Sequence, residues 1–214
     1  MDLGCGPGWL GIAFAPLVGK VIGIDPEPAM LEAAQAIADA AAVEIELIEG
    51  SSFDLSPPLG RFRAVAIGRA FHWMDRADTL RKLDPLIEED GAVMLFNDVR
   101  PDVPQNAWYK RYSDVVDRFT NKSVGFAPER LRHEPILLES RFSQITRIGV
   151  IEQRLVPVAR LIDRALSMST SSPEQLGALS GQLAQDLTME MSPFATAGAV
   201  VEVIESQVLI AQRR

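Results

Sequence analysis

The chain of 214 residues contains a single cysteine, Cys5, so neither an internal disulfide bond nor a cysteine-based zinc cluster can form within it. With only two histidines and no carboxylates clustered at ligand spacing, we expect no metal site. Basic residues are also in the minority, with 21 Lys and Arg against 29 Asp and Glu, a formal net charge of -8. Because this sign repels phosphate backbones, we expect no nucleic-acid partner.

Long apolar runs are absent as well. No stretch reaches the roughly 18 residues needed to cross a bilayer, and the N-terminus lacks the charged-then-apolar order of a signal peptide. We therefore expect a cytoplasmic protein that needs no membrane partner. The hydrophobic fraction of 47% and the charged fraction of 23% are ordinary for a globular chain, and the length predicts a single domain over residues 1–214.

Short apolar runs alternate with helical patterns in the first half of the chain. Buried strands are predicted at residues 20–25, 62–67 and 92–96, and the period-two alternation at residues 44–48 predicts a further strand. The helix before the last of these strands is predicted to end at Gly91, with Pro85 kinking or shortening it. Strands separated by helices in this way predict βαβ units and a parallel sheet, which makes residues 1–96 an α/β structure.

The pattern is weaker beyond Asn97. Helices are predicted at residues 105–119, at 159–168 and from Pro173 onward, and a strand is predicted at 144–156. The periodicity of residues 199–212 fits a strand and a helix equally well. The helix at 105–119 carries Trp108, Tyr112 and Phe119 on one face, which either pack in a helix core or cap a substrate pocket.

Three glycines close to the N-terminus give the strongest local signal. Gly4, Gly6 and Gly8 follow a first strand and precede a helix, where glycine permits a tight turn and the close approach of a ligand. A dinucleotide-binding loop of the pattern Gly-x-Gly-x-x-Gly would need glycine at position 9, where Trp9 stands. The loop therefore predicts a nucleotide-like cofactor other than NAD, while a purely structural turn is the alternative.

The segment from Asp2 to Gly8 resembles motif I of the class I S-adenosylmethionine-dependent methyltransferases. Residues 23–26 are similar to the second strand of that family, and residues 50–55 resemble its adenine-binding turn. The Ala-Phe-His-Trp segment at residues 70–73 resembles the small methyltransferases of the trans-aconitate type. These motifs cover residues 1–96, and the remainder matches only in general plan.

The resemblance implies a Rossmann-like, doubly wound sheet of seven mostly parallel strands with an antiparallel last strand, for which we take residues 199–212. Residues 1–96 would bind the cofactor, and residues 97–214 would supply a helical cover, at about 97–143 and 157–198, together with the last strands. The helix that usually precedes strand one, and the start of that strand, are not found in the chain, so we expect an N-terminally short domain.

The resemblance also assigns roles to individual residues. Asp25 would accept hydrogen bonds from both ribose hydroxyls, although an aspartate after a strand can also be a plain helix cap. Ser51 departs from the family, which commonly has an acidic residue there to bind the adenine amino group. The expected cofactor-binding residues are Asp2, Gly4, Gly6, Gly8, Asp25, Pro26, Met30, Ser51, Ser52, Phe53, Gly68, Arg69 and Ala70.

The predicted function is S-adenosylmethionine-dependent methyl transfer to a small-molecule acceptor, with a carboxylate or hydroxyl oxygen expected. His72 is the candidate general base, with packing at the pocket rim as the alternative, and His133 is expected at the surface. Two other classes of function stay open: a non-catalytic interaction module with the same fold, and an NAD-dependent oxidoreductase, which Trp9 argues against. The sequence leaves the oligomeric state and the acceptor open.

Overall fold

The computed structural model describes residues 1–120, 132–168 and 170–214. Its internal contacts divide the chain into two compact units, which are described separately. Unit 1 comprises Met1–Asn97, Pro128–Gly149 and Gln207–Arg214, and unit 2 comprises Asp98–Ala127 and Val150–Ser206. The predicted helical cover at 97–143 includes residues 121–131, which lie outside the described residues.

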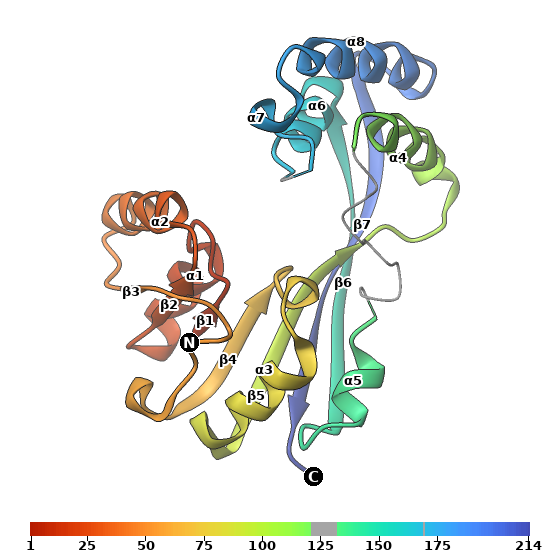
Figure 1. The fold of residues 1–214 in the computed structure, drawn as a ribbon. Helices are drawn as coiled ribbons and strands as arrows, with labels where there is room; N and C mark the ends of the chain where they lie inside the picture. Colours follow the sequence, from red (N-terminus) through yellow and green to blue (C-terminus); the bar gives the residue numbers. More distant parts are fainter. Residues whose placement is uncertain (121–131, 169) are drawn as a thin grey trace. The chain divides into compact units, whose positions relative to one another are not determined.

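Seven strands form one sheet in the order β3-β2-β1-β4-β5-β7-β6 (Figure 1). Strands β1 to β5 pair in parallel, and β7 is antiparallel. The Rossmann-like methyltransferase fold predicted from the sequence is thus confirmed, including a last strand at residues 199–212. The strands are β1 (Asp2–Leu3), β2 (Ile22–Asp25), β3 (Glu46–Glu49), β4 (Phe62–Gly68), β5 (Ile87–Val99), β6 (Gln144–Pro157) and β7 (Ala199–Gln212).

Eight α-helices are described, and α1, α2 and α3 each lie between two strands of the first half of the chain. They are α1 (Trp9–Val18), α2 (Pro28–Ala40), α3 (Arg76–Leu83), α4 (Ala107–Phe119), α5 (Glu134–Leu138), α6 (Val158–Leu166), α7 (Pro173–Leu176) and α8 (Leu179–Met191). None of the helices in the described part of the chain is long and apolar enough to cross a membrane.

The core of unit 1 lies between its strands and helix α3. The strand residues Ile24, Val65 and Val93 are almost fully buried, and α3 packs on β4 and β5 through Leu80 and Leu83. Burying an aliphatic side chain of this size stabilises the fold by about 1.5–3 kcal/mol. This core fixes the carboxyl ends of the parallel strands, where doubly wound sheets bind their ligands.

Helix α3 ends earlier than the sequence predicts. It stops at Leu83, a short turn spans Asp84–Leu86, and β5 begins at Ile87, so a helix extending to Gly91 is wrong. Pro85 has no N–H to continue the helix, and Ile87 pairs instead with Phe62 on β4. The predicted shortening at Pro85 is confirmed. Gly91 lies inside β5, where a Cβ atom would come within 2.8 Å of the Arg63 carbonyl oxygen.

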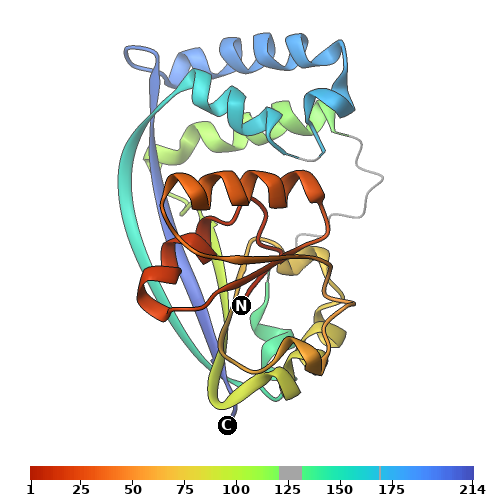
Figure 2. The same cartoon turned by 90° about the vertical axis from the view of Figure 1, so that its left-hand side faces the viewer.

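Unit 2 is built on three helices that lie side by side, α4, α6 and α8 (Figure 2). Trp108 and Tyr112 of α4 are almost fully buried among leucines of α6 and α8. The indole Nε1 of Trp108 donates to the Val201 carbonyl oxygen at 2.8 Å, and the Tyr112 hydroxyl donates to the Leu161 carbonyl oxygen at 3.2 Å. The aromatic stripe of α4 is therefore helix core, and a pocket cap is the wrong alternative for Trp108 and Tyr112.

Candidate functional site

The glycine loop links the end of β1 to the start of α1. Gly4, Gly6 and Gly8 all have positive φ, at 68°, 52° and 79°, in the left-handed region that glycine adopts without steric cost. The amides of Gly4 and Cys5 both donate to the Ile24 carbonyl oxygen, at 2.8 and 3.0 Å, which fastens the loop to β2. A Cβ atom at Gly4 would lie 2.6 Å from the Cβ of Ala70, so the loop also touches the segment that follows β4.

Asp25, the last residue of β2, joins the loop from the neighbouring strand. Its Oδ2 accepts from the Gly6 amide at 2.8 Å, and its Oδ1 accepts from the Glu27 amide at 3.0 Å. The N-cap of α2 is Glu27, so Asp25 does not occupy the cap position itself. A carboxylate has about four lone-pair sites, and these two bonds leave the others for a ligand.

Asp2 lies beneath the loop and is 2% exposed. Its Oδ2 accepts from the Gly11 amide in the first turn of α1 at 2.9 Å. Burial raises the pKa of this carboxyl to about 6, against the opposing effect of the Gly11 hydrogen bond. Burial also raises the pKa of the neighbouring Cys5 thiol to about 12, with the charge of Asp2 adding to the shift, so Cys5 is an inert filler at neutral pH.

The turn after β3 lies beside Asp25, because the Gly50 amide donates to the Asp25 carbonyl oxygen at 3.1 Å. Ser51 donates to Asp54 Oδ2 through its amide and through its hydroxyl, both at 2.7 Å. These hydrogen bonds from Ser51 hold the pKa of Asp54 below its usual range. Sequence reasoning missed Asp54, although it stands three residues after the position where the family commonly has an acid.

Apolar surface is exposed around the same two turns. Phe53 is 66% exposed, and Lys82 donates to its carbonyl oxygen at 2.8 Å with the ammonium 5.5 Å from the ring centre. Met30, in the first turn of α2, is 42% exposed, whereas Ser52 is buried. These large apolar side chains at the carboxyl ends of β2 and β3 form an exposed surface on which a flat ligand can pack.

The segment after β4 has unusual backbone geometry. Arg69 adopts a positive φ of 54°, which is strained for a residue other than glycine, and its amide donates to the Phe96 carbonyl oxygen at 3.1 Å. A Cβ atom at Gly68 would lie 2.7 Å from Cδ1 of Leu10, so the Leu10 side chain would have to shift to admit a larger residue there. Strain of this kind collects at functional sites, and here it lies directly before Ala70, the residue that the glycine loop contacts.

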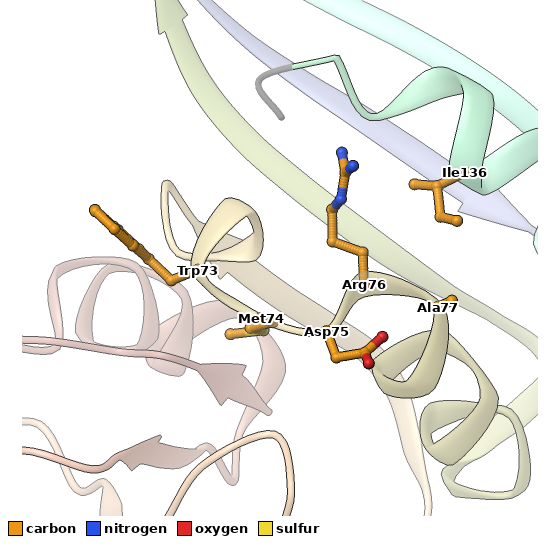
Figure 3. Close-up of a pocket in the computed structure, with 6 residues that line it drawn as sticks. All are labelled: Trp73, Met74, Asp75, Arg76, Ala77 and Ile136. Carbon is orange, nitrogen blue, oxygen red and sulfur yellow. The ribbon is translucent and has the colours of Figure 1, made fainter. Parts of the chain in front are cut away.

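A cleft of about 440 Å³ opens just beyond this segment (Figure 3). Its lining residues come from the turn after β4, the start of α3 and α5: Trp73, Met74, Asp75, Arg76, Ala77 and Ile136. Met74 also reaches the glycine loop, since its Cε would lie 3.3 Å from a Cβ atom at Gly4. The ring of His72 lies 4.8 Å from that of Trp73, next to the cleft.

His133 is buried, which corrects the expectation of a surface residue. It is 7% exposed, and its ring lies edge-on to Phe71 with centroids 5.2 Å apart. Burial, with a smaller contribution from the charges of Arg76 and His72, lowers its pKa to about 4. Within the described residues its Nδ1 has no hydrogen-bond partner. The charged, proline-flanked sequence around His133 gave no sign of the contact with Phe71 that buries it.

Unit 1 thus brings most of the predicted site residues to one edge. Direct contacts link the glycine loop to Asp25, Asp25 to the turn at Gly50, and the loop to Ala70. The described residues contain no group of three or more His, Cys, Asp or Glu that could hold a metal ion. The arrangement suits a ligand with hydroxyl donors for Asp25 and a flat apolar part for Met30 and Phe53.

Comparison with known proteins agrees with this geometry. Residues 1–91 match the family model described as a methyltransferase domain. The fold is that of a class I methyltransferase. A methyltransferase of Bacillus subtilis named YcgJ is 27% identical over 146 residues, covering 67% of this chain and 52% of its own length. A ubiquinone biosynthesis O-methyltransferase of Azorhizobium caulinodans is 29% identical over 96 residues, covering 44% of this chain and 38% of its own length.

Solved structures show the same methyltransferase fold along the whole chain. The crystal structure of YcgJ from Bacillus subtilis aligns with a TM-score of 0.58 at 17% identity, covering all of this chain and 91% of that one. A methyltransferase from Thiobacillus denitrificans, solved with S-adenosylhomocysteine, aligns with a TM-score of 0.54 at 16% identity, covering all of this chain and 84% of that one. The chain spans about half the length of the curated relatives it matches.

Proposed function

We propose that this chain is an S-adenosylmethionine-dependent methyltransferase that acts on a carboxylate or hydroxyl oxygen of a small molecule. The observation that carries the proposal is the contact between the glycine loop and Asp25, whose Oδ2 lies 2.8 Å from the Gly6 amide nitrogen. The methyltransferase-domain match to residues 1–91 supports the cofactor. The Ala-Phe-His-Trp segment supports a small acceptor, since it resembles the trans-aconitate type.

The residues at this edge fit the cofactor. A Cβ atom at Gly6 would meet nothing within 4 Å, so the loop leaves open space on that side. Asp25 would bind the ribose hydroxyls through the lone pairs that its two backbone bonds leave over. Asp2 would support the loop from below through its bond to Gly11.

The remaining roles follow from position. Exposed Met30 and Phe53 would pack on the adenine, and the strained turn after β4 would face the sulfonium. The proposed cofactor-binding residues are Asp2, Gly4, Gly6, Gly8, Asp25, Pro26, Met30, Ser51, Ser52, Phe53, Gly68, Arg69 and Ala70.

The cofactor supplies an activated methyl group on a positively charged sulfur, and the chain's own contribution is to orient the acceptor and exclude water. These effects are worth up to about 7–11 kcal/mol of the barrier. A carboxylate acceptor is already ionised at neutral pH and needs no base. For a hydroxyl acceptor we assign His72 as the base, because it lies next to the cleft and histidine accepts protons near neutral pH.

Calorimetric titration with S-adenosylhomocysteine tests the cofactor assignment. Asp25→Ala should weaken binding by about 1.5–3 kcal/mol, or roughly 10- to 150-fold, because charged hydrogen bonds to the ribose are lost. Asp39→Ala is the matched control, since Asp39 lies on α2 and its exposed carboxylate accepts a hydrogen bond from the exposed Gln35. Equal affinity in the two variants, or binding of NADH in place of S-adenosylhomocysteine, would overturn the assignment.

Transfer of a labelled methyl group to a panel of small carboxylic acids and phenols tests the reaction. Turnover of any member would exclude a non-catalytic interaction module with this fold. If phenols are methylated, His72→Gln should reduce kcat for them at neutral pH. If carboxylic acids are methylated, that reaction should be insensitive to the change.

A further inference from the structure

Unit 2 contains a buried carboxylate that three arginines share. Glu202 on β7 has no exposed side-chain surface, and its partners come from three other places in the fold. Arg100, directly after β5, donates from Nε to Glu202 Oε1 at 2.8 Å. Arg154 on β6 donates from Nε to Oε2 at 2.8 Å, and Arg164 on α6 binds both oxygens, at 2.8 and 3.2 Å.

The charges in this cluster do not balance. Burial alone would raise the pKa of Glu202, but the hydrogen bonds from Arg164, Arg100 and Arg154 outweigh it and lower the pKa to about 2. The carboxylate is therefore ionised at neutral pH and contributes one negative charge against three positive ones. Glu152, more than half exposed, lies 3.6 Å from Arg154 and offsets one more. Within these ion pairs, three arginines therefore meet two carboxylates, in a chain whose net charge is -8.

The other basic residues described in unit 2 are matched one to one. The four pairs are Lys110 with Asp114, Arg111 with Glu190, Arg118 with Asp186, and Arg160 with Asp163. Among the ion pairs described in unit 2, the Glu202 cluster is thus the one with more cations than carboxylates. Two arginines would suffice to satisfy a buried carboxylate, and the third adds repulsion between like charges unless another anion joins them.

Arg100 is the member with unused donors. Its Nε is bound to Glu202, its guanidinium lies 4.8 Å from the centre of the Tyr109 ring, and its side chain is 15% exposed. Its two terminal nitrogens have no hydrogen-bond partner among the described residues. Neither of them is fully buried, because His133 Nδ1 is the buried side-chain atom without a partner among those residues. The two terminal nitrogens of Arg100 therefore present a planar fork of N–H donors to solvent. Glu202 holds one edge of the guanidinium, and the Tyr109 ring lies against one face.

We propose that this fork is a binding site for the carboxylate group of a small organic acid. A planar guanidinium edge matches a carboxylate with two parallel hydrogen bonds, and fixing it beforehand reduces the conformational entropy lost on binding. Tyr109, which is 37% exposed, adds apolar surface beside the anion. The site lies within unit 2 and does not depend on the proposed methyl transfer.

Thermal unfolding and calorimetric titration of the full chain with sodium benzoate test the site. The melting temperature should rise with benzoate concentration relative to sodium chloride at equal ionic strength, because a ligand that binds only the folded state stabilises it. Arg100→Lys keeps the charge and loses the fork, and it should weaken benzoate binding at least tenfold. Arg118→Lys, from a one-to-one pair, should bind as the wild type does.

Three results would overturn the proposal: no benzoate binding by the wild-type chain, equal binding by Arg100→Lys, or equal stabilisation by sodium phosphate, which would indicate a general anion site. If Arg100→Lys does not fold, Tyr109→Leu provides the second variant, because it keeps Arg100 and removes the ring that holds its plane. That variant should also weaken benzoate binding, and unchanged affinity there would equally count against the site.

Discussion

Replacing His133 with leucine should stabilise the protein increasingly as the pH falls. His133 is 7% exposed, and burial lowers its pKa from 6.5 to about 4. A histidine with a lowered pKa in the folded state contributes stability that is present above about pH 6.5 and lost as the pH falls toward 4. Each pH unit in this window costs about 1.4 kcal/mol, so the wild-type chain should lose about 2 kcal/mol through His133 between pH 7.5 and 5.0. Leucine does not titrate.

Urea unfolding at pH 7.5, 6.0 and 5.0 measures this difference. The free energy of unfolding of His133→Leu minus that of the wild type should grow by about 2 kcal/mol across the series. Leu137→Ala is the control, because Leu137 is fully buried in α5, the helix that His133 precedes, and cannot titrate, so its loss of about 2–5 kcal/mol should be the same at each pH. A His133→Leu difference that does not change with pH would refute the reasoning.

Three further changes test other parts of the structure. Gly4→Ala should lower the free energy of unfolding by about 1–3 kcal/mol more than Gly6→Ala does in chemical denaturation. Both glycines have positive φ, but a Cβ atom would meet Ala70 only at Gly4, so equal losses would contradict this reasoning. Asp2→Asn should stabilise the chain by up to about 3 kcal/mol at pH 7.5 and less toward pH 4 in calorimetry, since a carboxyl whose pKa is raised to about 6 loses stability as the pH rises through 6. Glu202→Gln should cost about 3–5 kcal/mol by urea unfolding, because three arginines lose their carboxylate; a loss below about 1 kcal/mol would show that water replaces it.

Much of the fold could be predicted because the strands of unit 1 are short and buried and are separated by amphipathic helices. The ends of the helices and strands were harder to predict from the sequence, because they depend on which residues pair with one another in the folded sheet. Residues 88–91 look like the end of a helix, yet they lie in β5 because Ile87 pairs with Phe62 across the sheet. The strand at 199–212 needed a family resemblance, because its apolar positions fit two periodicities.

Some residues singled out in the structure could likewise be found from the sequence, and others could not. The glycine loop and Asp25 could be found because their function demands particular residue types at particular spacings. Glu202 could not, because its arginine partners lie 102, 48 and 38 residues away along the chain and nothing in its own segment marks it as buried. His133 was missed for the same reason, since its burial depends on Phe71, far away in the sequence.

The position of β7 between β5 and β6 has a consequence for biosynthesis. Strand β6 is translated before residues 199–212, so its backbone N–H and C=O groups on the side of β7 lack their partner strand until those residues have been added. The sheet can close only when the final strand inserts between two that are already present. We expect nascent chains stalled before residue 199 to be captured by chaperones that bind unpaired strands, and full-length chains to be released from them.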